Sequence, residues 1–158
     1  MPCQAGHRVL SGQQVAAALA VPEGVDVLYV ERLRTAQGEP LALLRNRFPA
    51  GLLGPDGGRW ETTGLYRLMR GAGIALHSAR QTVGARTAAD AEAELLGEPA
   101  GAPVLAVERT TYDDAGRPVE SGSHVYRASR YTFEFQLLAR GQGPPPGGGP
   151  GIPPGHGP

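Results

Sequence analysis

Residues 104–130 contain two stretches typical of half-buried strands joined by a tight turn, and this pattern limits the folds open to the chain. An apolar run at 104–107 leads into a segment rich in Thr and Tyr, residue types that favour a pleated surface. Turn chemistry follows at Asp113 and Gly116, because Asp accepts hydrogen bonds from the nearby backbone and Gly adopts positive φ. Pro118 then begins the return strand, where its missing N–H costs least.

A weaker copy of this hairpin lies upstream. Val-Glu-Arg followed by Gly-Glu-Pro, within residues 30–40, repeats the Val-Glu-Arg followed by Gly-Arg-Pro within residues 107–118, with a turn one residue shorter. The surrounding residues predict strands at 25–35 and 41–48. Two hairpins of similar design are therefore expected in one sheet.

The remaining segments predict helices and further strands around the hairpins. In chain order they are a helix at 12–20, a helix through Leu65, Leu68 and Met69 after a cap at Thr62 or Thr63, a strand at 74–87, a helix from 87 to 97 capped with the help of Asp90, and a last strand at 131–139. Helices thus interrupt a sheet built mostly of hairpins. The predicted fold class is α+β, with a mostly antiparallel sheet and flanking helices.

Composition bounds the function classes. The chain has 158 residues, of which 41% are hydrophobic and 19% charged, as expected of one globular domain. Its 15 basic residues balance 15 acidic ones, so no overall field draws it to nucleic acid or an anionic membrane. All the basic residues are Arg, whose planar guanidinium can bind carboxylate or phosphate through two hydrogen bonds.

The compartment and the tail follow from three further features. Cys3 is the only cysteine, so no internal disulfide can form and a reducing compartment is expected. The N-terminus lacks a signal-peptide pattern and no apolar run could span a bilayer, which predicts a cytoplasmic protein without membrane contact. Gly and Pro make up 15 of the 18 residues from 141 to 158, a composition that predicts disorder.

The residues that could carry chemistry lie on the predicted strands. Arg32 and Arg34 are two positions apart on one strand and so share a face, which is the geometry of a clamp for an anion. Glu120 and Tyr126 are also at even spacing on the return strand. The alternative is that all four are solvated strand residues that form cross-strand pairs.

Catalytic and metal-binding patterns are not evident. His77 and His124 each stand alone on a predicted strand, and a lone strand His is more often structural than a catalytic base. No grouping of His, Cys, Asp and Glu has metal-ligand spacing. The sequence therefore predicts a non-enzyme with no catalytic residues, no metal and no cofactor.

At the central hairpin the chain resembles a known family. Residues 95–135 are similar to the C-terminal half of the UTRA domain, the ligand-sensing domain of HutC-type regulators in the GntR superfamily. The family's upstream signatures follow in order, as VERLRTAQGEPLALLRNRFP at 30–49, GLYRLM at 64–69 and GIALHSARQTVGA at 73–85. The match covers roughly residues 20–138.

The resemblance implies both fold and function. It implies a fold like that of chorismate lyase, with a small-molecule effector site in a cleft between sheet and helices. It also implies a homodimer with an attached winged helix-turn-helix domain, whose affinity for operator DNA changes when the effector binds. The effector would do so by shifting the population between arrangements of the two domains.

The family's effector site, carried over by position, falls on six residues of this chain. Arg32 and Arg34 usually hold an anionic or polar part of the effector, and Glu120 and Tyr126 usually bind hydroxyl or amide groups. The other two, Leu44 and Gly64, stand where many sugar-phosphate sensors have Glu and Ser. Losing a carboxylate and a hydroxyl makes that end of the expected pocket more apolar and argues against an amino-sugar phosphate.

The expected organisation is a leader at 1–20, which could be the remnant of an interdomain linker, a UTRA effector-binding domain at 21–140, and the tail at 141–158. Residues 1–20 hold neither a recognition helix nor a basic cluster. We therefore expect DNA binding only through a winged helix-turn-helix domain not present in this chain. A truncated regulator is the favoured interpretation, and a free-standing sensor is the alternative.

Two rival functions remain open from the sequence. A chorismate lyase-like enzyme would use Arg32 or Arg34 to clamp a carboxylate and Glu120 as the acid. A dimerisation module would pair with full-length regulators and bind no ligand.

Overall fold

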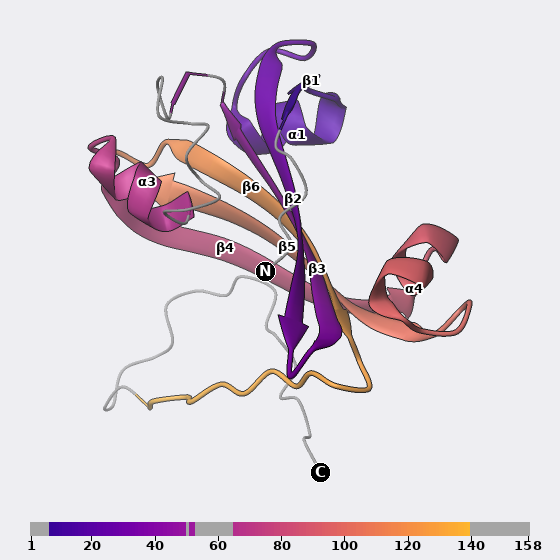
Figure 1. The fold of residues 1–158 in the computed structure, drawn as a ribbon. Coiled ribbons are helices and arrows are strands. Elements are labelled where there is room, and N and C mark those ends of the chain that lie inside the picture. Colours follow the sequence, from indigo (N-terminus) through magenta and orange to yellow (C-terminus); the bar gives the residue numbers. More distant parts are fainter. Residues whose placement is uncertain (1–6, 50, 53–64, 140–158) are drawn as a thin grey trace.

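The computed structural model describes residues 7–49, 51–52 and 65–139, and within them one antiparallel sheet organises the chain (Figure 1). Six strands pair in the order β1-β2-β3-β6-β5-β4. The strands are β1 (His7–Leu10), β2 (Asp26–Ala36), β3 (Glu39–Pro49), β4 (Leu76–Thr87), β5 (Pro103–Asp113) and β6 (Pro118–Arg127), and the helices are α1 (Gln13–Leu19), α3 (Leu65–Gly71) and α4 (Asp90–Leu96). The α+β, mostly antiparallel fold predicted from the sequence is confirmed.

The two similar hairpins are neighbours in this sheet. β2–β3 and β5–β6 meet through β3 and β6, which pair from Ala42↔Tyr126 to Arg47↔Ser121. The first hairpin closes at Gln37 and Gly38, both at positive φ, a pair suited to the tight turn between twisted strands. The second closes around Asp113, whose Oδ1 accepts hydrogen bonds from the backbone N–H of residues 115 and 117, as its turn chemistry predicts.

Two local expectations need correction, and one strand was not foreseen. The pairing of β1 with β2 was not predicted, because residues 1–11 show no alternation of apolar and polar positions. A strand predicted at 131–139 is wrong for this chain, because these residues have no regular secondary structure. The cap of α4 comes from Glu92, whose Oε2 accepts from the N–H of Ala89, rather than from Asp90. The predicted cap at Thr62 or Thr63 lies outside the described residues.

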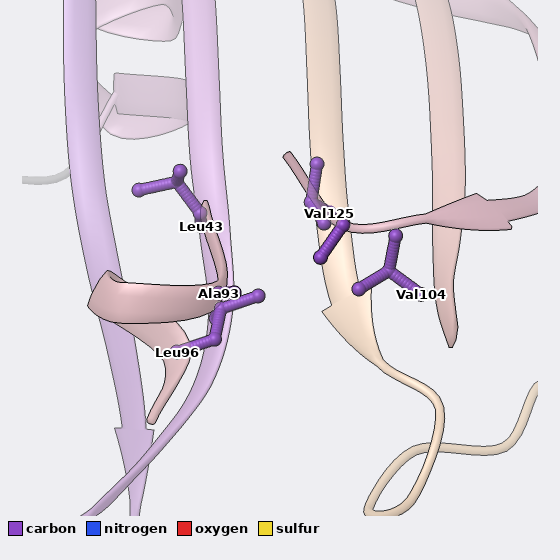
Figure 2. Close-up of a cluster of buried hydrophobic side chains, with 6 residues drawn as sticks. Leu43, Ala93, Leu96, Val104 and Val125 are labelled. Carbon is purple, nitrogen blue, oxygen red and sulfur yellow. The ribbon is translucent and has the colours of Figure 1, made fainter. Parts of the chain in front are cut away.

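Helix α4 packs on one face of the sheet, called here the α4 face. Ala93 and Leu96 of the helix belong to one buried cluster with strand residues of β3, β5 and β6, and in Figure 2 they lie next to Leu43 of β3. The strand side chains in this fully buried cluster are Leu43, Val104 and Val125. None of the described helices is long and apolar enough to cross a membrane.

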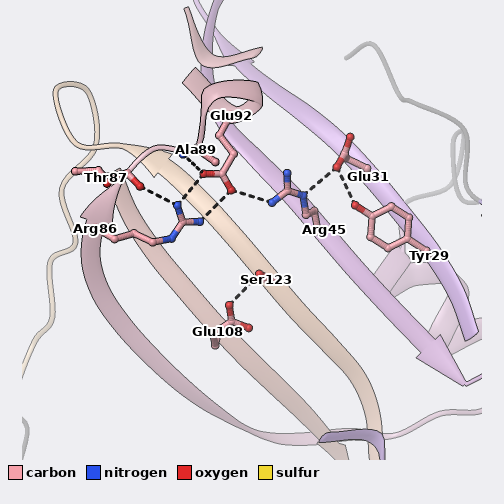
Figure 3. A network of polar contacts seen from close by, with 9 residues as sticks. All are labelled: Tyr29, Glu31, Arg45, Arg86, Thr87, Ala89, Glu92, Glu108 and Ser123. Atoms are coloured by element: carbon pink, nitrogen blue, oxygen red, sulfur yellow. Dashed lines mark hydrogen bonds and ion pairs between the residues drawn. The ribbon is translucent and has the colours of Figure 1, made fainter. Parts of the chain in front are cut away.

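A chain of charged side chains also holds α4 to the sheet (Figure 3). The buried carboxylate of Glu92 accepts hydrogen bonds from both terminal nitrogens of Arg86 at 2.7 and 2.9 Å, and from Arg45 at 3.1 Å. Arg45 in turn donates to Glu31 at 2.9 Å, and Glu31 accepts from Tyr29. Every charge in this network has an opposite partner, which offsets the cost of burying it.

We predict that Glu92 makes stability depend on acid. The Arg86 hydrogen bonds, together with those from Ala89 and Arg45, lower the pKa of Glu92 from 4.5 to about 2. Its contribution is therefore present above pH 4.5 and is lost as the pH falls toward about 2, with a size of at most about 3 kcal/mol. Denaturant unfolding from pH 7 to 2 should show Glu92→Gln less stable at pH 7 and less acid-sensitive.

The matched control is Glu94→Gln, an exposed carboxylate on the same helix. An acid response of Glu92→Gln as steep as that of Glu94→Gln would contradict the assignment.

Candidate functional site

The opposite face of the sheet, called here the site face, carries the polar residues singled out from the sequence. Antiparallel partners share a face, so the pairs Arg32↔Leu44 and Leu44↔His124 put those three side chains in one row across β2, β3 and β6. The next row contains Arg34, Ala42 and Tyr126 by the same pairing. Successive strand residues alternate faces, so this surface lies opposite α4.

A chain of hydrogen bonds crosses the site face. Arg32 Nη2 donates to Asn46 Oδ1 at 3.0 Å, and Asn46 Nδ2 donates to Glu120 Oε1 at 2.6 Å. Thr111 Oγ1 donates to Glu120 Oε2 at 2.7 Å, so each oxygen of this buried carboxylate accepts a side-chain hydrogen bond. Asn46 therefore connects Arg32 of the expected anion clamp to Glu120, the residue expected to bind hydroxyl or amide groups.

Five of the six expected effector-site residues share this face. Arg32 and Leu44 are partly exposed, Arg34 is exposed, and Glu120 and Tyr126 are buried. Burial raises the pKa of Tyr126, with Tyr131 contributing, so its hydroxyl stays protonated. The sixth residue, Gly64, lies outside the described residues.

Sequence reasoning missed Asn46 and assigned His124 no role in the site. Both belong to even-numbered series on their strands, 44–46 on β3 and 120–126 on β6, which is the one signal that could have included them. Their partners could not be named, because cross-strand neighbours depend on the register. His124 is buried, and burial together with Arg109, Arg32 and Arg47 lowers its pKa from 6.5 to about 4.

Two segments border the site face. At one end, Met69 of α3 packs on Val30 and Phe48, and Tyr66 of the same helix accepts a 3.3 Å hydrogen bond from Arg109. At the other end, the segment that follows β6 packs on the site face through Tyr131. The ring centroid of Tyr131 lies 4.4 Å from that of Tyr126.

The charge of the site face favours an anion. Arg32, Arg34 and Arg109 are cations there, and Glu120 is a carboxylate already bonded to Asn46 and Thr111. Arg109 is held by Gln81 through bonds of 2.8 and 2.6 Å. Across the described part of the chain, no group of three or more His, Cys, Asp or Glu residues could hold a metal ion.

Two hollows lie away from these residues. One, of about 340 Å³, is bordered by Val15, Tyr29 and Arg47, and Arg47 lies over the ring of Tyr29 at 5.1 Å. The other, of about 470 Å³, is bordered by Leu19, Ile74 and Arg117 among others. Neither hollow is bordered by an expected effector-site residue. The candidate site therefore stays on the site face.

We predict that Gly122 is needed to form the site. A Cβ at this position would lie 2.7 Å from His124 Nε2 and 2.9 Å from Glu120 Oε1, closer than atoms can pack. Gly122→Ala should therefore lower the free energy of unfolding by about 1–3 kcal/mol in denaturant melts, because two buried polar side chains must move.

Gly84→Ala on β4 is the control, since a Cβ there meets nothing within 4 Å. That change should be neutral or stabilising by about 0.5 kcal/mol. Equal losses for the two variants would argue against crowding at Gly122.

One family model matches most of the chain. It is the model of the UTRA domain, and it matches residues 7–132. Among curated proteins, the HTH-type transcriptional repressor NagR of Bacillus subtilis is 32% identical over 124 residues, which are 78% of this chain and 51% of NagR. The HTH-type transcriptional repressor PhnF of Mycolicibacterium smegmatis is 32% identical over 130 residues, 80% of this chain and 52% of PhnF. The chain spans about half the length of these relatives.

Solved structures have the same fold. A candidate transcriptional regulator from Streptomyces coelicolor superposes with a TM-score of 0.81 at 58% identity, covering 87% of this chain and 92% of that one. The effector domain of PhnF from Mycobacterium smegmatis gives a TM-score of 0.77 at 28% identity, covering 87% of this chain and 85% of that domain.

Proposed function

The chain belongs to the UTRA domain family, and from this premise we propose that it binds a small-molecule effector on the site face and performs no catalysis. The observation that carries the proposal is the row of Arg32, Leu44 and His124, with Arg34 and Tyr126 in the next row. Membership of this family confirms the assignment made from the sequence motifs. The two curated relatives described above are transcriptional repressors, which supports a regulatory role.

We further propose that the effector acts on DNA through a second domain. The curated relatives are HTH-type regulators about twice as long as the matched region. A ligand that binds one arrangement of the sensing and DNA-binding domains more tightly shifts the population toward that arrangement. The protein would then act in the cytoplasm, where the chromosome is accessible.

The test of effector binding is a thermal-shift screen of the chain with sugars, sugar phosphates, amino acids, aromatic acids and chorismate. A ligand at a hundred times its dissociation constant adds about 2.7 kcal/mol of stability. Arg32→Ala with Arg34→Ala should abolish the shift, because both cations of the clamp are lost, while the unliganded protein still melts cooperatively. Arg80→Ala, an exposed cation on β4, is the control and should respond as the parent does.

Three results would count against this proposal. One is an unchanged shift in the double variant, which would place the effector elsewhere. Another is release of pyruvate from chorismate, which would favour the chorismate lyase-like enzyme. The third is a well-folded protein that no compound stabilises, which would favour the ligand-free dimerisation module.

We propose a homodimer that uses residues 131–139 and the edge of the sheet. This segment runs as an extended line below the sheet in Figure 1, and it exposes Phe135 by 65%, Leu137 by 87% and Leu138 by 83%. Contiguous exposed apolar side chains mark interaction sites. The edge strand β4 offers unpaired backbone groups, and ten of its twelve residues are exposed.

The dimer can be tested by shortening the chain. A chain ending at Ala139 should remain dimeric by light scattering after size exclusion, whereas one ending at Phe133 should be monomeric, because it lacks the three exposed apolar side chains. Keeping Tyr131 and Phe133 preserves their contacts with Tyr126. Dimers of equal stability from both chains would place the interface elsewhere.

A further inference from the structure

Two buried polar atoms on the site face have no hydrogen-bond partner in the described part of the chain. They are Nδ1 of His124 and Nε of Arg32. The His124 residue is only 5% exposed. A buried donor or acceptor without a partner costs about 1–3 kcal/mol, so proteins rarely leave such atoms unused.

The two side chains lie in one row with an apolar residue between them. Arg32 pairs with Leu44, and Leu44 pairs with His124. Two strand spacings separate the backbones of Arg32 and His124 by roughly 10 Å. The segment with Tyr131 and Phe133 packs on the cluster that includes Leu44, so a small molecule over Leu44 reaches both side chains once that segment moves aside.

The other edge of the His124 imidazole is closely packed. It fills the space beside Gly122, where an added Cβ would lie 2.7 Å from Nε2. Arg32 is positioned by its 3.0 Å hydrogen bond to Asn46. Both atoms without partners therefore belong to side chains that are already positioned.

The ring is uncharged at neutral pH. The charged groups around it on the site face are Arg32 from β2, Arg109 from β5 and Glu120 from β6 itself, and Arg47 of β3 acts from the opposite face. Burial with the three cations lowers the pKa of His124 to about 4. A neutral imidazole has one N–H donor and one acceptor nitrogen, and a neutral hydroxyl or amide can bond to either. An anionic group of a ligand would therefore bind Arg32 rather than His124.

We propose that His124 determines the specificity of the effector site. The effector places an oxyanion, carboxylate or phosphate, on Arg32, and a neutral hydroxyl or amide against Nδ1 of His124, with its apolar part over Leu44. His124 thereby supplies a polar contact that Leu44 does not. This inference rests on the proposed function and names the class of its ligand.

The experiment uses matched pairs of probes that differ in hydroxyl groups. Calorimetry with the purified chain compares benzoate with 3- and 4-hydroxybenzoate, and propyl phosphate with glycerol 3-phosphate, so that its two arms distinguish carboxylate from phosphate. In one arm the hydroxylated member should bind the parent at least about fivefold more tightly.

Variants then assign that preference. His124→Leu should remove it while leaving the affinity for the plain acid within about twofold, and His124→Asn should retain part of it. His77→Leu, an exposed His on β4, is the control and should keep the full preference. The preference should also be constant from pH 6 to 8, because the ring stays neutral throughout.

Three patterns of probe binding overturn the inference. They are equal affinity for both members of every pair, a preference that survives in His124→Leu, and an affinity for both members of a pair that grows as the pH falls toward 6, which would put the anion on a protonated ring. If only ligands of another class bind, and Arg32 is needed for them, the proposed function stands and this inference falls. If the parent binds none of the probes, the assignment of a hydroxylated oxyanion is wrong.

Discussion

The pairing of β3 with β6 is the constraint on which the rest of the structure depends. It joins the two hairpins into one sheet and fixes which residues share a face. A slip of one residue would carry Leu43 and Val125 out of the core and turn Asn46 and His124 toward α4. The buried cluster under α4 therefore selects the register, and the register in turn assembles the site face.

The two faces treat buried charge differently. On the α4 face, Glu92 is matched by Arg86 and Arg45, and the network serves to hold a helix. On the site face, Glu120 is bonded to neutral Asn46 and Thr111, while Arg32 keeps a buried nitrogen without a partner among the described residues. The site face therefore has two buried polar atoms without partners among the described residues, and the α4 network has none. This difference favours a ligand on the site face.

The sequence predicted the features that depend on neighbouring residues, namely turns, strands and the residues that share a face. Asp113 and Gly116 marked one turn, the repeat of Val-Glu-Arg marked the second hairpin, and even spacing put Arg32 with Arg34 and Glu120 with Tyr126. It could not predict contacts between strands, so the bridge through Asn46 and the burial of His124 emerged only with the register. The strand expected at 131–139 failed for a related reason: alternating apolar residues form a strand only where the fold places them beside a sheet edge, and residues 131–139 do not pair with one.

Tyr126 connects the proposed site to the proposed dimer contact. Its ring centroid lies 4.4 Å from that of Tyr131 and 5.5 Å from that of Phe133, at the start of the segment that exposes Leu137. An effector that moves Tyr126 must also disturb these ring contacts, so it would bind the arrangements of the segment with different affinities. Linkage then requires the reverse, that dimerisation changes effector affinity by the same factor. A contact this short gives the proposed sensor a physical route from a ligand on the sheet to the arrangement of its two copies.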